Sequence, residues 1–134
     1  MTPELFYLAL TALLASVLWI PSVIGYVQTR GFLRTKDYKV APTSALPAWV
    51  DRAVRAHANM VENFSAFAAL VLIAHVMGLS TNLTIAAAAV FFWARLLHAV
   101  VHISGVSILM LRTVIFGVGN LATLALAVAV LTAA

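Results

Sequence analysis

Four polar side chains recur about one helical turn apart in a segment that is otherwise apolar. At 100° per residue they fall within about 80° of one another, so a helix would place them on one stripe. Arginine grips carboxylates and other anions through paired N–H groups, so a stripe with more arginine than acid favours an anionic ligand. The four residues are Arg52, Arg55, Asn59 and Glu62.

A second polar stripe follows in the next apolar segment. Arg95, His98 and His102 repeat the same spacing, and Arg112 comes early in the last apolar segment. Charged groups inside a membrane are costly and usually mark a functional site or an ion pair. At a rise of roughly 1.5 Å per residue, Arg55, His98 and Arg112 lie roughly 8–10 Å from the loop ends of their helices. We therefore predict one cationic pocket shared by three helices.

Two other interpretations of these residues remain open. Glu62 and Arg95 can form a buried structural ion pair, because a lone ion at that depth would be severely penalised. His98 and His102 can ligate a metal or a haem, but the chain has no cysteine and no second membrane acid to complete a metal site. We predict no bound metal, and any sulfur chemistry must come from a ligand because the chain has no thiol.

Composition decides what kind of scaffold carries these residues. Of 134 residues, 64% are hydrophobic and 9% are charged, and the mean hydropathy is +1.07. A soluble domain carries roughly 25% charged residues, and a membrane helix needs about 20 apolar ones. The chain therefore has room for four spans and no separate soluble domain. The net charge of +4 lies on no basic face, so we predict no nucleic-acid partner.

The apolar segments predict an all-α membrane protein, a single domain over residues 1–134 built as a bundle of four transmembrane helices. Pro21 predicts a bend in the first helix, and a polar loop over 28–47 carries half of the lysines and arginines. The positive-inside rule then places this loop in the cytoplasm and both termini outside. The helices are expected at about 4–27, 48–77, 83–103 and 107–131.

The polar stripe resembles a known family signature. The pattern R-x-x-R-A-H-x-N-x-x-E between Arg52 and Glu62 is similar to the second helix of the MAPEG family, the membrane-associated proteins of eicosanoid and glutathione metabolism. A second match runs from Ala94 to His98, and the resemblance continues to His102 and Arg112. Its members include microsomal glutathione transferases, leukotriene synthases and microsomal prostaglandin E synthase.

This resemblance implies a homotrimer that binds glutathione between neighbouring subunits on the cytoplasmic side. Arg112 matches the arginine that stabilises the glutathione thiolate, and His98 matches a position that is His or Tyr in the family. His102 departs from the family pattern, because many relatives have a tyrosine there that contacts glutathione. The remaining positions implied to bind the tripeptide are Arg55, Asn59, Glu62 and Arg30.

We therefore expect a glutathione-dependent transferase or peroxidase that acts on lipophilic electrophiles in a membrane, here the bacterial inner membrane. One alternative is a non-catalytic protein of the same fold whose pocket binds another anion or a lipid. Another is a small four-helix transporter, although that function is typical of a lone membrane acid without surrounding arginines. A haem-binding subunit is the third alternative.

Overall fold

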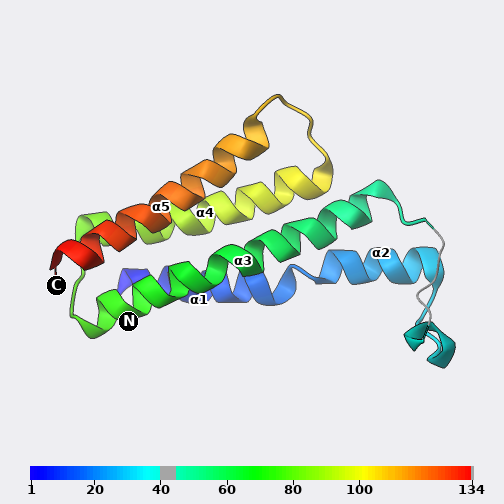
Figure 1. The fold of residues 1–134 in the computed structure, drawn as a ribbon, viewed down its shortest axis with the longest axis horizontal. Helices are drawn as coiled ribbons and strands as arrows, with labels where there is room; N and C mark the ends of the chain where they lie inside the picture. Colours follow the sequence, from blue (N-terminus) through cyan, green and yellow to red (C-terminus); the bar gives the residue numbers. More distant parts are fainter. Residues whose placement is uncertain (40–44, 134) are drawn as a thin grey trace.

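The computed structural model describes residues 1–39 and 45–133, and it is built from helices (Figure 1). Within those ranges there is no strand, and four stretches are long and apolar enough to cross a membrane, the first of which comprises two helices. The all-α, four-span fold predicted from the sequence is therefore confirmed. The helices are α1 Pro3–Val17, α2 Ile20–Arg30, α3 Ala48–Val76, α4 Asn82–Ser104 and α5 Leu111–Ala133, with a short 3₁₀ helix at Thr35–Tyr38.

The first span is broken rather than bent. α1 ends at Val17 and α2 begins at Ile20, with Pro21 in its first turn. Proline has no N–H to bond the carbonyl four residues earlier, and its ring clashes with that carbonyl, so the helix cannot run through unbroken. The indole of Trp19 instead donates to the carbonyl of Ser16 at 2.7 Å. The break therefore falls just ahead of the predicted bend.

The last helix begins four residues later than the expected position 107. Gly105 ends α4 with φ 75° and ψ 22°, and Met110 has φ 63° directly before α5. Left-handed backbone at both ends cannot belong to a continuous helix, so residues 105–110 form a longer connection than predicted. Nε of Arg52 donates to the carbonyl of Ile103 at 3.2 Å and so caps the end of α4.

The helices pack tightly at one end of the bundle and separate at the other. Both termini and the α3–α4 turn lie at the tight end, whereas the α2–α3 and α4–α5 connections lie at the opposite end (Figure 1). The rings of Phe67 and Phe91 stack at the tight end with centroids 3.9 Å apart, inside a cluster with Val71 and Leu126. Towards the two connections α5 leans away from α3, whereas the end of α4 stays against α3 through the Arg52–Ile103 hydrogen bond.

A buried carboxylate fastens the tight end. Glu4 is 3% exposed and accepts hydrogen bonds from Oγ of Ser80 at 2.9 Å and Oγ1 of Thr84 at 2.6 Å. Thr84 also shares a capping box with Thr81 at the start of α4. A carboxylate near a helix N-terminus is favoured by the positive end of the helix dipole, so Glu4 ties the start of α1 to the start of α4.

Candidate functional site

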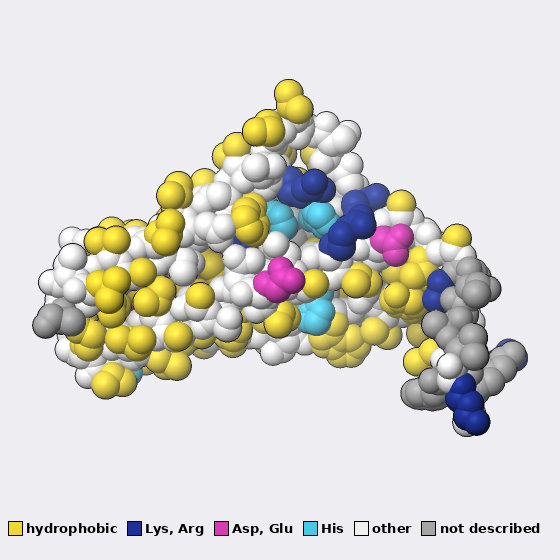
Figure 2. Space-filling view, in the orientation of Figure 1, with side chains coloured by type: hydrophobic (Ala, Val, Ile, Leu, Met, Phe, Trp, Pro, Cys, Tyr) yellow, Lys and Arg dark blue, Asp and Glu magenta, His cyan; other side chains and the backbone are white. Residues whose placement is uncertain are grey.

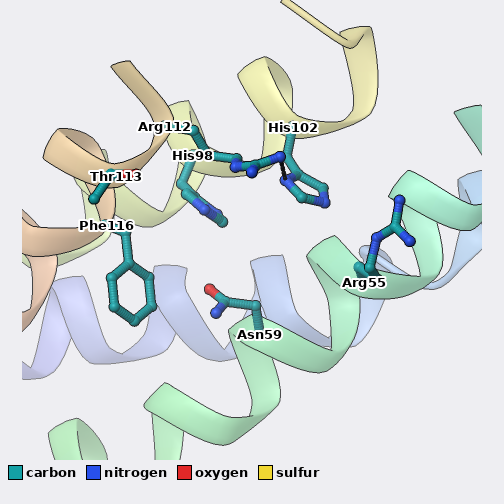
Figure 3. A pocket seen from close by; sticks show the side chains of 7 residues that line it. All are labelled: Arg55, Asn59, His98, His102, Arg112, Thr113 and Phe116. Carbon is teal, nitrogen blue, oxygen red and sulfur yellow. Dashed lines mark hydrogen bonds between the residues drawn. The ribbon is translucent and has the colours of Figure 1, made fainter. Parts of the chain in front are cut away.

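A cavity of about 320 Å³ lies where α5 separates from α3, between the first turns of α3 and α5 and the last turns of α4. In the space-filling view, lysine or arginine and histidine side chains gather at this separation on a face that carries many apolar side chains (Figure 2). Three helices supply the lining, as the close-up shows (Figure 3). The lining residues are Arg55 and Asn59 from α3, His98 and His102 from α4, and Arg112, Thr113 and Phe116 from α5.

The charge of this cavity is one-sided. Arg55 and Arg112 contribute two guanidinium groups, and no acidic side chain in the described part of the chain lines the cavity. Charges in a partly buried cavity are screened far less than on an open surface, so the two arginines favour an anion there. In residues 1–39 and 45–133 no group of three or more His, Cys, Asp or Glu side chains comes together as a metal site. The prediction that no metal binds remains a prediction.

Arg112 determines the hydrogen-bonding state of His102. Nη1 of Arg112 lies 3.3 Å from Nδ1 of His102, and because a guanidinium only donates, Nδ1 must accept. A neutral imidazole that accepts at Nδ1 carries its proton on Nε2, and this atom is buried without a hydrogen-bond partner in the described structure. The ring of His98 stacks on His102 with centroids 5.6 Å apart. Nε2 of His102 therefore carries an N–H that no described residue accepts.

Behind the cavity wall, Arg95 is 2% exposed, and its hydrogen bonds within the described residues go to amide oxygens. Nη1 donates to Oδ1 of Asn59 at 3.1 Å, and Nη2 donates to Oδ1 of Asn63 at 3.3 Å and of Asn120 at 2.9 Å. Amide oxygens satisfy the donors without cancelling the charge. The guanidinium therefore keeps a positive charge just behind the cavity.

Two aromatic rings and a glycine complete the surroundings of Arg95. Its Cζ lies 5.1 Å from the ring centre of Phe91 and 4.9 Å from that of Phe116, within the range of a cation–π contact. A Cβ added at Gly119 would lie 3.0 Å from Nη2, so α5 approaches the guanidinium where no side chain stands between them. The position of Arg95 is thus defined from three helices.

The predicted ion pair between Glu62 and Arg95 is wrong. Glu62 is exposed, and no ion pair joins it to Arg95 in the described residues. The reason lies in helical geometry, because Asn59 and Asn63 are four residues apart and share one face, whereas Glu62 is rotated about 100° from Asn63. The two asparagines therefore occupy the side of α3 that faces Arg95, and Glu62 points out of the bundle.

The predicted ligand residues divide into two groups. Arg55, Asn59, His98, His102 and Arg112 all line one cavity. Two others lie elsewhere in the subunit. Glu62 is exposed on α3, and Arg30 lines a different cavity of about 390 Å³ at the end of α2, where its Cζ stands 5.5 Å from the ring centre of Tyr26.

Sequence reasoning missed several residues of this site. Asn63 directly follows the quoted motif and Asn120 lies in the middle of the last apolar span, yet neither was assigned a role. Both could have been recognised from the sequence, because a side-chain amide within a membrane span needs a polar partner, as a charged side chain does. Phe116 was missed because nothing in an apolar helix distinguishes a ring facing a guanidinium from one facing lipid.

These features define a multi-pass membrane protein with a cationic cavity at one end of a four-span bundle. The sequence pattern of the MAPEG family matches residues 5–132, which is almost the whole chain. The protein belongs to the MAPEG family and is an integral membrane protein of that class. No individual curated protein matches the chain.

Proposed function

We propose that this protein is a glutathione-dependent transferase or peroxidase that forms the glutathione thiolate in the cavity between α3, α4 and α5. The observation that carries the proposal is the convergence of Arg55 and Arg112 with Asn59, His98 and His102 on a cavity that no acidic side chain of the described residues lines. Glutathione has two carboxylates and a thiol, so an arginine pair with neutral donors suits both its binding and its ionisation.

Arg112 is the residue that we assign to the chemistry. A free thiol ionises near pH 8.5, so only a few per cent is thiolate at neutral pH. A guanidinium beside the sulfur stabilises the anion, and the thiol proton passes to water. The thiolate then forms a carbon–sulfur bond with an electrophilic carbon, whose leaving group departs with the bonding electrons. With a hydroperoxide, two glutathione molecules are oxidised to the disulfide, and the products are an alcohol and water.

A lipophilic second substrate is consistent with the apolar surface next to the cavity. Val114, Ile115 and Val118 of α5 line an apolar groove with Trp93 and Leu97 of α4, with a volume of about 350 Å³. The residues of α5 that line the polar cavity lie in the same two turns. An electrophile dissolved in lipid can therefore approach the first two turns of α5 without crossing water.

We further propose that the protein is a homotrimer and that its site faces the cytoplasm. Glu62 lies about 21 Å along α3 from Ala48, near mid-membrane, and is exposed in a single subunit. A charge facing lipid at that depth costs several kcal/mol, so a neighbouring copy is expected to cover it. Arg34 and Lys39, together with Arg30, lie at the same end of the bundle as the cavity, and the positive-inside rule places that end in the cytoplasm.

Calorimetry of the detergent-solubilised protein tests binding, and ultraviolet difference spectroscopy tests ionisation. We expect glutathione and S-methyl glutathione both to bind, and glutathione alone to give a thiolate band at neutral pH. If both bind and no band appears, the protein is a binding protein of the family rather than a transferase. If neither binds, the cavity serves another anion and the proposed activity is wrong.

A further inference from the structure

The buried Arg95 determines the orientation of the Asn59 side-chain amide in the cavity wall. Nη1 of Arg95 donates to Oδ1 of Asn59 at 3.1 Å. A guanidinium has only N–H donors, so the atom of the Asn59 amide that faces it must be the oxygen. The amide nitrogen is then directed away from Arg95, and it has no acceptor within the described residues. Asn59 lines the cavity, so its unpartnered N–H groups are available to a ligand that enters there.

The Arg95 guanidinium is held in place by contacts other than its hydrogen bond to Asn59, so it would not move with the Asn59 amide if that amide rotated. Its Nη2 atom bonds two further amide oxygens, and the guanidinium stands between the rings of Phe91 and Phe116. Asn63 strengthens the arrangement, because its Nδ2 donates to the backbone carbonyl of Asn59 at 2.8 Å. Arg95 is therefore joined to the side chain of Asn59 directly and to its backbone through Asn63.

We propose that Arg95 is a positioning residue for ligand recognition, which holds the Asn59 amide so that Nδ2 donates to an oxygen acceptor of the bound ligand. The identity of that ligand as glutathione rests on the proposed function. The contact between Arg95 and Asn59 does not depend on it. Arg95 itself does not line the cavity and acts through Asn59.

The physical consequence is a donor that is set before binding. An unrestrained asparagine amide can present oxygen or nitrogen, and the wrong orientation would turn an acceptor towards an anion. Fixing the orientation in the empty protein removes an ordering cost that binding would otherwise carry. It also selects a carboxylate or peptide carbonyl at this position over an ammonium group, which has no acceptor for the Asn59 N–H.

A double-mutant cycle with glutathione tests this coupling. Arg95→Lys keeps a charge but loses the planar fork that reaches three oxygens, and Asn59→Ala removes the donor. We expect each single change to weaken glutathione binding roughly tenfold, as for loss of one hydrogen bond to a charged group. The double variant should bind no more weakly than the weaker single variant. If the two effects add, Arg95 acts independently of Asn59 and the proposal is wrong.

Two aspartate variants keep the test decisive if Arg95→Lys does not fold. Asn59→Asp and Asn120→Asp each place a carboxylate against the same guanidinium, so both retain a partner for Arg95. Asn120 does not line the cavity, whereas Asn59 does. We expect Asn59→Asp to lose glutathione binding at least tenfold more than Asn120→Asp. Equal losses would mean that only the net charge of Arg95 matters, and wild-type binding by Asn59→Asp would overturn the proposal.

A measurement without any ligand separates this inference from the proposed function. The side-chain amide signals of Asn59 in a ¹⁵N nuclear magnetic resonance spectrum are assigned by their loss in Asn59→Ala. In the empty protein we expect them to shift in Arg95→Lys and to stay in place in Thr84→Val, at the other end of α4. If they do not shift in Arg95→Lys, the contact is absent. If they shift but wild type does not bind glutathione, the contact stands and the proposed function fails.

Discussion

Arg112 hydrogen-bonds to Nδ1 of His102 at 3.3 Å and so links α5 to α4 directly at the cavity. Both residues also line a neighbouring cavity of about 290 Å³ beneath residues 105–110. Their hydrogen bond therefore stands between the two spaces. The Arg112 guanidinium keeps further N–H groups for a ligand, whereas Nδ1 of His102 is already occupied by Arg112.

Replacing Arg112 with leucine should separate thiol ionisation from binding. Each unit of thiol pKa corresponds to roughly 1.4 kcal/mol of preference for the thiolate, and in the proposed function the Arg112 guanidinium is the main source of this preference. We expect Arg112→Leu to lose the thiolate band while glutathione affinity falls less than about tenfold, because Arg55 and Asn59 still hold the peptide. S-methyl glutathione, which cannot ionise, is the control ligand. A band that persists in the variant would make Arg112 a binding residue only.

Replacing His102 tests whether the Nε2–H contacts the ligand. His102→Phe removes both the acceptor for Arg112 and the Nε2–H donor, and we expect glutathione to bind roughly two- to tenfold more weakly by calorimetry. His102→Tyr keeps a hydroxyl that can donate, so its affinity should stay closer to that of wild type. If phenylalanine and tyrosine give the same affinity, the ligand does not use a donor at this position.

Much of this architecture was predictable because membrane spans obey simple rules of length and charge. Four apolar stretches and two polar stripes were enough to predict the bundle and a pocket shared by three helices. The register of individual contacts was not predictable. Whether Arg95 meets Glu62 or Asn63 depends on about 100° of helix rotation, and hydropathy does not resolve which side of α3 faces α4.

The late start of α5 shows a second limit of the sequence. Residues 106–110 are apolar enough to continue a helix, and the left-handed backbone at Gly105 and Met110 is what excludes them. Glycine at position 105 gave a signal for the end of α4. Methionine rarely adopts a positive φ, so its presence at position 110 does not signal that a helix begins after it.

The tight end of the bundle should depend on Glu4. Glu4→Ala removes the acceptor of the Ser80 hydroxyl and leaves the Thr84 hydroxyl only the Thr81 carbonyl, and we expect it to destabilise the protein by about 1–3 kcal/mol. Glu4→Gln keeps one acceptor oxygen and should cost less. Thermal unfolding in detergent measures both variants. Because Glu4 lies at the opposite end from the cavity, glutathione affinity should be unchanged, and a loss of affinity would contradict this assignment.

The assembly prediction can be tested at Glu62. Native mass spectrometry in mild detergent should show trimers of the wild-type protein. If Glu62 packs against a neighbouring subunit, Glu62→Leu removes a polar contact and should shift the distribution towards monomers. If Glu62 instead faces lipid, leucine relieves the cost of an exposed charge and the variant should be more thermally stable than wild type. A monomeric wild type would contradict the trimer outright.

Two glycines of α5 provide a matched test of the space around Arg95. A Cβ at Gly117 would have nothing within 4 Å, whereas one at Gly119 would lie 3.0 Å from Nη2 and 3.1 Å from Nε of Arg95. Alanine in a helix is favoured over glycine by about 1 kcal/mol, so Gly117→Ala should stabilise the protein slightly. Gly119→Ala gains the same propensity but pushes on a guanidinium that three hydrogen bonds and two rings hold in place.

We therefore expect Gly119→Ala to be less thermally stable than Gly117→Ala, although both changes add one methyl group to the same helix. Displacing Arg95 by a few tenths of an ångström also lengthens its bond to Asn59, so glutathione affinity should fall in Gly119→Ala and not in Gly117→Ala. Calorimetry on the two variants side by side measures this difference. Equal stability and equal affinity would mean that α5 moves away from Arg95 without cost, and that the guanidinium is not confined as the structure indicates.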